Sequence, residues 1–588
     1  MEILRLFDLL DQRQQQMPGR PVFSNKKDGK WEDHYIDEYI EKANLVSYAL
    51  LQLGVKRGEN VALISEGRPE WNYIDMGVQQ IGAVLLPIYP TISENDYKYI
   101  LSISEVRVLF LESGELLRKI RNIRPELPML QHIYTISPCP TQESFNDLLA
   151  LGRSHAAPQK VQAIKDSILT VDVATIIFTS GTTGLPKGVL LSHRAIIANI
   201  NGIKSSPDPS WTRSLSFLPM CHIYERMISY LYQWLNYNIF YAESIATVGA
   251  DVQSCHPHMM AAVPRFLEKI YDKIYRKGEN LKGAKRKLFF WAVDVALNYE
   301  LDASKRSACY EIKRRVADLL VFRTIRQSLG GSLKMLVSGS ASIQPKLVRF
   351  FSCVGLDLYE GYGMTECAPL VAVTNTEKNG RRIGSVGFAL PGVDVRVDPQ
   401  TSEIQCRGVN VMNGYYKEPE LTAQSIDPDG WFHTGDTGYF DPDGYLFLTG
   451  RLNSMFKTSM GKYVNPEVIE EKFKESPFVL DMMVVGEGQK FAAALVVPDF
   501  DFLKGWCLRH GVKADTREEM VSNKAVLARY QRVLEKYNPH FGATEQVKRI
   551  RLLTEYWTLG NGMLTPTFKI RRKVIGRVCN AEIAALFA

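Results

Sequence analysis

Hydrophobic positions along the first 170 residues alternate between helical and strand-like spacing. Residues 36–53 carry apolar side chains at the spacing of an amphipathic helix, and residues 60–65 follow as a short apolar strand. A helix over 71–81 and a strand over 83–89 repeat this order. Helices that alternate with short apolar strands predict an α/β fold with largely parallel sheets.

The pattern changes twice further along the chain. A second helix-and-strand series runs from residue 175 to about residue 370. Residues 384–450 then show short alternating strands broken by Pro-Gly and Asp-Gly turns, which predicts a β-rich subdomain. A helix over 466–474, a strand pair over 482–497 and helical segments towards the end predict a further α+β domain.

The length of 588 residues exceeds what one hydrophobic core supports, so two or three domains are expected. We predict a large domain over 1–451 with α/β subdomains and the β-rich part, and a small mobile α+β domain over 452–588.

The content of 45% hydrophobic and 23% charged residues is typical of a soluble globular protein. A membrane-spanning stretch and a secretory signal are not expected. Nine cysteines without a Cys-x-x-Cys pair favour a reducing, cytoplasmic compartment over a disulfide framework or a zinc site.

The net charge of +7 is concentrated in one segment. Residues 265–326 carry 16 Lys and Arg against 8 Asp and Glu, with apolar residues at helical spacing among them. Two interpretations stay open: a solvated pair of surface helices, or a basic face that rests peripherally on anionic lipid at the inner face of a membrane. Nucleic acid is disfavoured because no recognised reading motif accompanies the charge. The oligomeric state, including a homodimer, is also left open.

The most informative segment is residues 175–189, where a strand ends in a loop followed by Lys187. Glycines let a backbone approach phosphate oxygens closely, and successive N–H groups make a cradle for anions. The pattern differs from a Walker loop, because Pro186 stands where that motif has glycine and Gly188 follows the lysine. The hydroxyl and glycine residues predicted to bind phosphate are Thr179, Ser180, Gly181, Thr182, Thr183 and Gly184.

Residues 179–188 resemble the signature loop of the adenylate-forming superfamily, the AMP-binding enzymes. Residues 337–341 resemble the loop that lines the adenine pocket in that family, and residues 359–366 resemble its second nucleotide motif. The residues matched to the adenine loop are Gly339, Ser340 and Ala341.

The second nucleotide motif supplies further roles by the same resemblance. Tyr362, followed by Gly363, would stack on adenine, and Thr365 would bond the α-phosphate of ATP. Glu366 would hold Mg²⁺ with Thr179 of the first loop. A carboxylate beside a hydroxyl suits a hard, oxygen-seeking cation.

Three more residues complete the resemblance. Asp436, in residues 430–436, would accept hydrogen bonds from the ribose hydroxyls, and Arg451 would lie near ribose and phosphate. The resemblance places a hinge between the domains at Asn453, where relatives more often carry Asp or Lys.

Lys569 matches the family's lysine that reaches into the active site from the small domain and stabilises charge during adenylation. Its neighbours Arg571, Arg572 and Lys573 are interpreted as a solvated tail. The resemblance implies an acyl-adenylate made from ATP, whose acyl group passes to a thiol such as coenzyme A.

Residues 215–226, 262–271 and 456–467 resemble motifs of long-chain fatty acid–CoA ligases. His222 would lie near the carboxylate of the fatty acid, although a packed core histidine is an alternative interpretation. Met460 stands where a second glycine is common in that group.

Several other functions stay open from the sequence. A fatty acyl-AMP ligase, an acyl-carrier-protein synthetase and a luciferase-like oxygenase all use the same adenylate. A non-catalytic lipid-binding protein on this fold is an alternative of another class. The presence of Lys569, Glu366 and Asp436 speaks against it, and the failed Walker pattern disfavours a P-loop ATPase.

Overall fold

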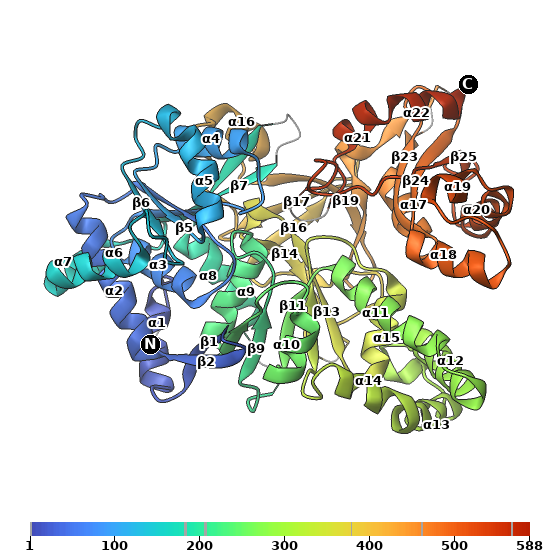
Figure 1. The fold of residues 1–588 in the computed structure, drawn as a ribbon, viewed down its shortest axis with the longest axis horizontal. Helices are drawn as coiled ribbons and strands as arrows, with labels where there is room; N and C mark the ends of the chain where they lie inside the picture. The colour runs from blue at the N-terminus through green and yellow to red at the C-terminus, as the bar shows by residue number, and fades with distance from the viewer. Residues whose placement is uncertain (1–2, 181–184, 205–207, 378, 460–462, 566–568) are drawn as a thin grey trace. The chain divides into compact units, whose positions relative to one another are not determined.

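The computed structural model describes residues 3–180, 185–204, 208–377, 379–459, 463–565 and 569–588. Contacts between residues divide the chain into two units. Figure 1 colours the chain from blue at the N-terminus to red at the C-terminus. The larger unit comprises Met1–Val395, Cys406–Phe432 and Pro442–Leu446, and the smaller unit comprises Arg396–Gln405, His433–Asp441 and Phe447–Ala588. The predicted α/β class, with a separate C-terminal domain, is confirmed. The boundary at residues 451–453 stays a prediction.

A seven-stranded sheet in the larger unit has the order β18-β8-β7-β4-β3-β5-β6. Strands β7, β4, β3, β5 and β6 run parallel, whereas β8 and β18 are antiparallel to their neighbours. Its strands are β3 (Asn60–Ile64), β4 (Val84–Pro87), β5 (Val108–Leu111), β6 (His132–Thr135), β7 (Val173–Ser180), β8 (Pro186–Ser192) and β18 (Gly414–Tyr415). Nearby helices are α2 (Ile36–Gln52), α3 (Pro69–Gln80), α4 (Glu94–Ile103), α5 (Gly114–Ile123), α6 (Phe145–Ser154) and α7 (Pro158–Ser167).

A nine-stranded sheet has the order β15-β14-β13-β12-β11-β9-β10-β1-β2. Its six strands from β13 to β1 run parallel. The strands are β1 (Pro21–Lys27), β2 (Lys30–Tyr35), β9 (Arg213–Ser216), β10 (Asn238–Tyr241), β11 (Met259–Ala262), β12 (Met335–Ser338), β13 (Asp357–Gly363), β14 (Leu370–Val373) and β15 (Phe388–Ala389). Helices α1 (Asp8–Gln16), α8 (His193–Ile203), α9 (Ile223–Trp234), α10 (Val248–Cys255) and α15 (Pro345–Val354) belong to the same unit.

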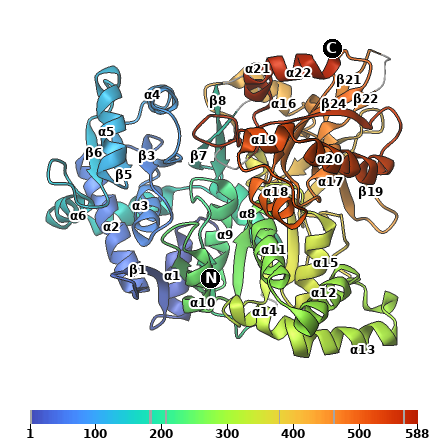
Figure 2. The same ribbon diagram turned by 45° about the vertical axis from the view of Figure 1, so that its right-hand side comes forward.

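The basic segment of residues 265–326 is helical, as the sequence predicts. It spans α11 (Pro264–Glu279), α12 (Gly283–Leu297), α13 (Ala308–Ala317), a π-helical turn η3 (Asp318–Phe322) and the start of α14 (Arg323–Ser328). Leu336 and Leu358 of the nine-stranded sheet share one hydrophobic core with Phe289 of α12 and Phe322 of η3. Figure 2 shows α12, α13 and α14 grouped together beside α15.

The smaller unit is built on a three-stranded sheet of order β23-β24-β25. Along β24, Ala494 and Val496 belong to one hydrophobic core, whereas Leu495 and Val497 belong to another. Both faces are therefore covered, which explains the unbroken apolar run of this strand. Its elements are α17 (Pro466–Phe473), β23 (Val479–Val485), β24 (Ala492–Pro498), α18 (Phe500–Arg509), α19 (Arg517–Ser522), α20 (Lys524–Tyr537), β25 (Val547–Leu552), α21 (Arg572–Val578) and α22 (Asn580–Phe587).

A four-stranded sheet fulfils the prediction of a β-rich stretch between residues 384 and 450. Its order is β16-β17-β19-β20, and its residues are divided between the two units. The strands are β16 (Val393–Val397), β17 (Glu403–Gly408), β19 (Phe432–Phe440) and β20 (Leu446–Arg451). Within the part of the chain that the structure describes, no helix is long and apolar enough to cross a membrane.

Candidate functional site

Three of the predicted segments lie at the ends of neighbouring parallel strands. Strand β9 leads to His222, β12 leads to residues 339–341, and β13 leads to η4 (Thr365–Cys367), which contains Glu366. Because β9, β11, β12 and β13 run in the same direction, these strand ends share one edge of the nine-stranded sheet. The crevice outside the carboxyl ends of parallel strands is where open α/β sheets bind ligands.

Glu366 lies beside the hairpin that carries the predicted phosphate loop. Strands β7 and β8 pair with Thr179 opposite Lys187, and β18 pairs with β8. The Tyr415 hydroxyl at the end of β18 donates to Oε1 of Glu366 at 2.8 Å. Nζ of Lys187 lies 5.7 Å from the centre of the Tyr415 ring. The fold thus brings together Thr179, Lys187 and Glu366, while residues 181–184 lie outside the described residues.

Tyr415 is a functional candidate that sequence reasoning missed. Its side chain is buried, and burial together with the nearby Glu366 carboxylate raises the pKa of Tyr415. The phenol therefore stays protonated and donates, and it orients a carboxylate that is itself half-buried. The only local signal was a Gly-Tyr-Tyr run after a turn, which says nothing about a partner 49 residues earlier in the chain.

The chain around Tyr362 and Thr365 is tightly packed. Both side chains are buried. A Cβ on Gly363 would lie 1.9 Å from the carbonyl oxygen of Pro369, which accepts a hydrogen bond from the Met364 N–H at 2.8 Å. Only glycine fits this close approach of the two backbone segments.

His222 is half-buried and caps helix α9. Its Nδ1 accepts a hydrogen bond from the Tyr224 N–H at 3.1 Å, and the Tyr224 hydroxyl donates to the Val337 carbonyl at 2.8 Å. Tyr224 thereby connects the His222 turn to the strand that leads to the predicted adenine loop. In that loop Ser340 has a φ of 71°. A neutral imidazole with Nδ1 occupied as acceptor carries its proton on Nε2.

In the smaller unit, Nε of Arg451 lies 2.8 Å from Oδ1 of Asp436, and the aspartate is almost fully buried. Glu403 supports this turn, because its carboxylate accepts from the Gly435 N–H at 2.9 Å and lies 2.8 Å from Nδ1 of His433. Glu403 carried no motif in the sequence. Its support of the Asp436 turn is a second contact that only the three-dimensional structure reveals.

The predicted hinge follows a closely packed turn. Asn453 lies in the 3-10 helix η5 (Leu452–Ser454). At Gly450 the backbone has a φ of 144°, and an added Cβ would lie 1.9 Å from Nδ2 of Asn465. Nδ2 of Asn465 also donates to the Thr449 carbonyl at 2.5 Å. A side chain at Gly450 is therefore excluded on both conformational and steric grounds.

The backbone of Lys569, in the smaller unit, is hydrogen-bonded to Thr565. The Thr565 N–H donates to the Lys569 carbonyl at 2.8 Å, and the Lys569 N–H donates to Oγ1 of Thr565 at 3.0 Å. These two bonds hold the backbone of Lys569, whose side chain is exposed. Residues 566–568 lie outside the described residues.

The interpretation of Arg572 as part of a solvated tail is wrong. Arg572 begins helix α21, and its guanidinium lies 2.5 Å from Oε2 of Glu470, which is 4% exposed. Oε1 of the same carboxylate accepts from the Val484 N–H at 2.6 Å. Burial nevertheless raises the pKa of Glu470 to about 7, against the opposing effect of Arg572. This pair anchors helix α21 to the core of the smaller unit.

Comparison with known proteins identifies the family. The family model for "AMP-binding enzyme" matches residues 10–416, and the model for "AMP-binding enzyme C-terminal domain" matches residues 454–588. The chain belongs to the AMP-binding enzyme family. The match covers the larger part of the chain and includes the β7–β8 hairpin and η4.

Similar proteins align with nearly the full length of this AMP-binding enzyme. The long-chain-fatty-acid–CoA ligase FadD15 of Mycobacterium bovis is 30% identical, with 97% of this chain and 95% of that protein covered. Long-chain-fatty-acid–CoA ligase 1 of Homo sapiens is also 30% identical, with coverage of 97% and 84%. Among solved structures, the anthranilate CoA ligase AuaEII in complex with anthranoyl-AMP aligns with a TM-score of 0.72 at 20% identity, over 99% and 98% of the two chains. That likeness confirms the fold of the AMP-binding enzyme.

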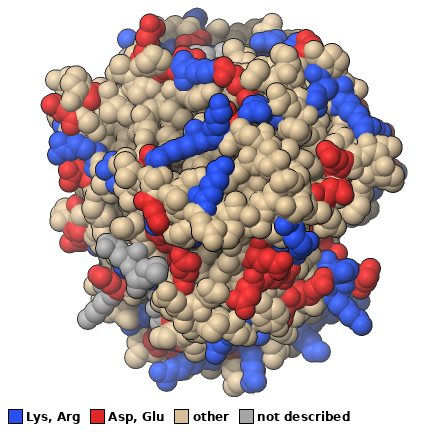
Figure 3. All heavy atoms as spheres, turned by 90° about the vertical axis from the view of Figure 1, so that its left-hand side faces the viewer, with Lys and Arg blue, Asp and Glu red and all other residues tan. Residues whose placement is uncertain are grey.

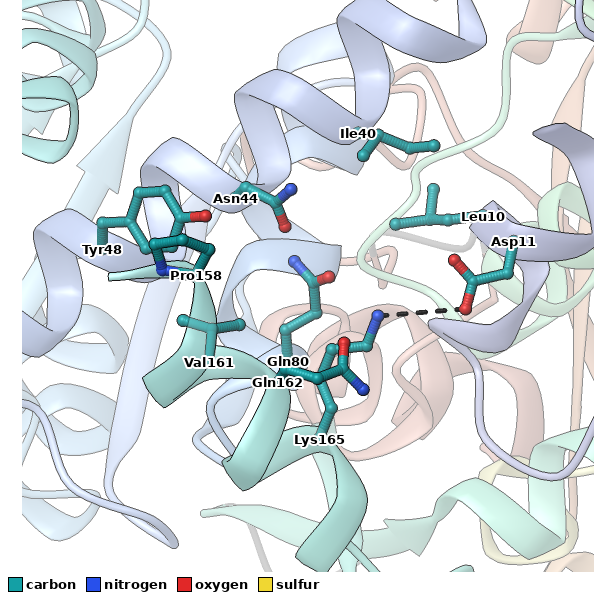
Figure 4. Close-up of a pocket in the computed structure, with 10 residues that line it drawn as sticks. All are labelled: Leu10, Asp11, Ile40, Asn44, Tyr48, Gln80, Pro158, Val161, Gln162 and Lys165. Carbon is teal, nitrogen blue, oxygen red and sulfur yellow. Dashed lines mark ion pairs between the residues drawn. The ribbon is translucent and has the colours of Figure 1, made fainter. Parts of the chain in front are cut away.

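A small polar pocket is lined by none of the predicted site residues (Figure 4). Its volume is about 210 Å³, and an ion pair of 3.9 Å joins Lys165 to Asp11 at its rim. Ligand pockets commonly enclose roughly 300–1,000 Å³, so we assign this pocket no role in the AMP-binding enzyme. Its lining is Leu10, Asp11, Ile40, Asn44, Tyr48, Gln80, Pro158, Val161, Gln162 and Lys165.

Glu225, on the first turn of α9, makes the stability of the larger unit fall as the pH rises from about 4.5 to 8. Oγ of Ser216 lies 2.5 Å from Oε1 of this fully buried carboxyl, and Oε2 has no hydrogen-bond partner among the described residues. Burial raises the pKa of Glu225 from 4.5 to about 8. The folded state therefore keeps a proton that the unfolded state releases above pH 4.5, so this contribution to stability is lost as pH rises to 8.

We expect Glu225→Gln to remove that dependence, because the amide stays neutral and keeps the contact to Ser216. Between pH 5 and pH 8 the wild type should lose on the order of 4 kcal/mol more unfolding free energy than the variant. Urea unfolding at the two pH values measures the difference. Glu41→Gln, an exposed site, is the control and should follow the wild type. Parallel pH profiles for Glu225→Gln and wild type would contradict the assignment.

Proposed function

We propose that this AMP-binding enzyme activates a long-chain fatty acid with ATP and transfers the acyl group to coenzyme A. Pyrophosphate leaves in the first step and AMP in the second. The observation that carries the proposal is that Glu366 lies beside the β7–β8 hairpin that holds Thr179 and Lys187. The chain also resembles long-chain fatty acid–CoA ligases over nearly its whole length.

The first step joins a carboxylate oxygen to the α-phosphorus of ATP. Its barrier comes largely from bringing two anions together, so aligned cations and hydrogen-bond donors lower it. In our proposal Lys187 and the loop from Thr179 to Gly184 hold the phosphates, and Thr365 contacts the α-phosphate. Tyr362, Gly363 and residues 339–341 hold the adenine. The Lys187–Tyr415 contact keeps the lysine beside Glu366.

Mg²⁺ fits Glu366 and Thr179 by the chemistry of their donor atoms. Mg²⁺ is usually bound through one or two carboxylates together with substrate phosphates, and not by an all-protein cage. Among the residues that the structure describes, no group of three or more His, Cys, Asp or Glu could hold a metal ion alone. Mg²⁺ would supply charge neutralisation at the phosphates when bound.

The remaining predicted residues have roles in both steps. Asp436 would accept hydrogen bonds from the ribose hydroxyls, and Arg451, its ion-pair partner, would hold it in place. Lys569 would neutralise charge during adenylation, and Asn453 would serve as the hinge about which the small domain turns between the steps. His222 would direct its Nε2 proton towards the carboxylate of the acid, since Nδ1 is occupied by the Tyr224 N–H.

The proposal includes a cytoplasmic location with peripheral contact at the inner face of a membrane. A long-chain acid partitions into lipid, so an enzyme that rests there meets its substrate directly. The net positive charge of residues 265–326 supports this placement.

Tyr415→Phe should weaken the response to Mg²⁺. The substitution removes the hydrogen bond to Glu366 but keeps the ring beside Lys187. A hydrogen bond to a charged group contributes about 1.5–3 kcal/mol, so the Mg²⁺ concentration for half-maximal pyrophosphate release should rise about 10- to 100-fold. The matched control is Tyr416→Phe, whose hydroxyl accepts from Asn60 at 3.3 Å. An unchanged Mg²⁺ response in Tyr415→Phe would remove Tyr415 from the site.

Product analysis tests the acid and the acceptor together. Purified enzyme with MgATP is given acids of increasing chain length, either alone, with coenzyme A, or with an acyl carrier protein. We expect acyl-CoA to form with long acids and coenzyme A. Acyl-AMP that accumulates without thioester formation would favour a fatty acyl-AMP ligase, and transfer to the carrier alone would favour an acyl-carrier-protein synthetase. The absence of pyrophosphate release with every acid would favour a lipid-binding protein.

A further inference from the structure

An apolar stripe lies exposed on helix α13 and the π-helical turn η3 of the larger unit. Ile312 and Leu319 are 64% and 69% exposed, and Val316 and Leu320 are 42% and 51% exposed. Residues at positions i, i+4, i+7 and i+8 of a helix share one face. Four large apolar side chains on nine consecutive residues form a continuous patch, whereas single exposed apolar residues need no explanation.

The opposite side of the same helical segment is anchored in the protein core. Ala317, Val321, Phe322 and Ile325 are all buried and belong to the hydrophobic core beneath the nine-stranded sheet. The segment is therefore firmly attached by one face while it presents the apolar stripe on the other. A helix that keeps apolar residues on both sides is expected to have a partner for the outer side.

The charges around the stripe are predominantly positive. Lys313, Arg315 and Arg323 are exposed. Both acidic residues between positions 308 and 328 are engaged by arginine, with Glu311 2.9 Å from Arg314 and Asp318 2.5 Å from Arg326. By contrast, the face at the left of Figure 1 shows Lys and Arg interspersed with Asp and Glu (Figure 3). The combination of an apolar stripe and basic flanks is characteristic of helices that lie in a lipid interface.

The aromatic residues that the sequence placed in this basic segment are not part of the stripe. Phe289 and Val295 of α12 are buried in the core, and Leu288, Phe290 and Trp291 are partly buried against it. The exposed apolar residues of the stripe are thus those of α13 and η3, within the segment that the charge count singled out.

We propose that the outer face of α13 and η3 is the element by which this protein docks on an anionic lipid surface. Ile312, Val316, Leu319 and Leu320 enter the interface between headgroups and acyl chains, while Lys313, Arg315 and Arg323 contact the anionic headgroups. An anionic lipid surface is the partner because its negative charge complements these basic residues. A second copy of the chain would bring the same positive flanks against each other, which like-charge repulsion opposes.

Vesicle sedimentation with the full-length protein tests the proposal. Vesicles of phosphatidylcholine and phosphatidylglycerol in equal parts are compared with vesicles of phosphatidylcholine alone, without ATP, acid or coenzyme A. We expect binding to the anionic vesicles to weaken at least tenfold in the double variant Ile312→Asp, Leu319→Asp. The triple variant Lys313→Ala, Arg315→Ala, Arg323→Ala should lose about fivefold per removed charge.

The matched control is Leu508→Asp, which changes an exposed leucine of the smaller unit, 74% exposed, in the same way. It should bind vesicles like the wild type. Thermal unfolding verifies that each variant is folded, since it does not require the stripe. Wild-type vesicle binding in the double variant overturns the proposal. A second outcome also overturns it: the wild type is a dimer, the double variant is a monomer, and vesicle binding is unchanged. The stripe would then bind a second copy of the chain. Because vesicle binding is measured without substrates, its outcome is independent of the proposed activity.

Discussion

Lys569→Ala is expected to slow formation of the acyl-adenylate by about 10²–10³-fold, the usual loss when one group that stabilises transition-state charge is removed. The transfer of a preformed acyl-adenylate to coenzyme A should continue at nearly the wild-type rate, because its charge changes occur at the thioester. Single-turnover assays of the two steps separate these effects. The side chain is exposed and the backbone is held by Thr565, so folding should be unaffected.

Lys573→Ala is the matched control for this prediction. It removes the same charge four residues later, from another exposed position of the same segment. Equal losses of adenylation in the two variants would mean that the basic segment acts through its overall charge. An undiminished rate in Lys569→Ala would remove this lysine from the mechanism.

The second large effect concerns the stability of the larger unit. Asp75 on α3 and Arg226 on α9 form a fully buried ion pair with an O–N distance of 2.5 Å. The guanidinium also donates to Oγ1 of Thr175 on β7 at 2.6 Å, so one network joins the strand that carries the phosphate loop to the helix that follows His222. Asp75→Ala leaves a buried charge without its partner, and we expect a loss of about 3–5 kcal/mol in unfolding free energy.

Urea unfolding measures that loss. The control is Glu41→Ala, which removes the partner of Arg153 in an exposed pair whose side chains are 61% and 65% accessible. It should change the stability by less than about 1 kcal/mol. The double variant Asp75→Leu, Arg226→Met should recover much of the stability, because no charge stays buried. A small effect of Asp75→Ala alone would mean that water reaches Arg226 in solution.

Local spacing of apolar residues predicted individual elements well. The helix expected over 36–53 is α2, the strand expected over 60–65 is β3, and the pair expected over 482–497 is β23 and β24. Each of these elements buries one or two of its faces, so the spacing of its apolar residues is enough to predict it. Which strands pair is a different matter. Strand β1 joins the second sheet by pairing Phe23 with Ile239, and no periodicity records such a distant contact.

The sequence predicts that a second series of helices and strands begins at residue 175. Local spacing of apolar residues could not predict which sheet these strands join. Strand β7 spans that point but pairs with β4 in the first sheet, and β8 pairs with β7. Strand β18 comes from the stretch that was expected to form the β-rich subdomain, yet it extends this first sheet too. Tertiary pairing is decided by long-range contacts between apolar faces, which alternation of helix and strand does not specify.

For the candidate site, the sequence motifs identified the functional side chains, and the structure revealed the residues that contact and orient them. Glycine-rich and acidic motifs pointed to Lys187 and Glu366, and the structure places both against Tyr415. Tyr415 and Glu403 carried no signal because their roles depend on neighbours distant in sequence. The predicted phosphate-binding residues Gly181, Thr182, Thr183 and Gly184 lie outside the described residues, and their roles stay predictions.

Transfer of oxygen from the acid to AMP tests the central claim most directly. A long-chain acid labelled with ¹⁸O in both carboxyl oxygens is incubated with MgATP and coenzyme A, and the products are analysed by mass spectrometry. Attack of a carboxylate oxygen on the α-phosphorus, followed by thiol attack on the acyl carbon, leaves one labelled oxygen in each AMP and none in pyrophosphate. That result is the one we expect. Label in inorganic phosphate with ADP as the nucleotide product, or acyl-CoA formed with unlabelled AMP, would contradict activation through an adenylate.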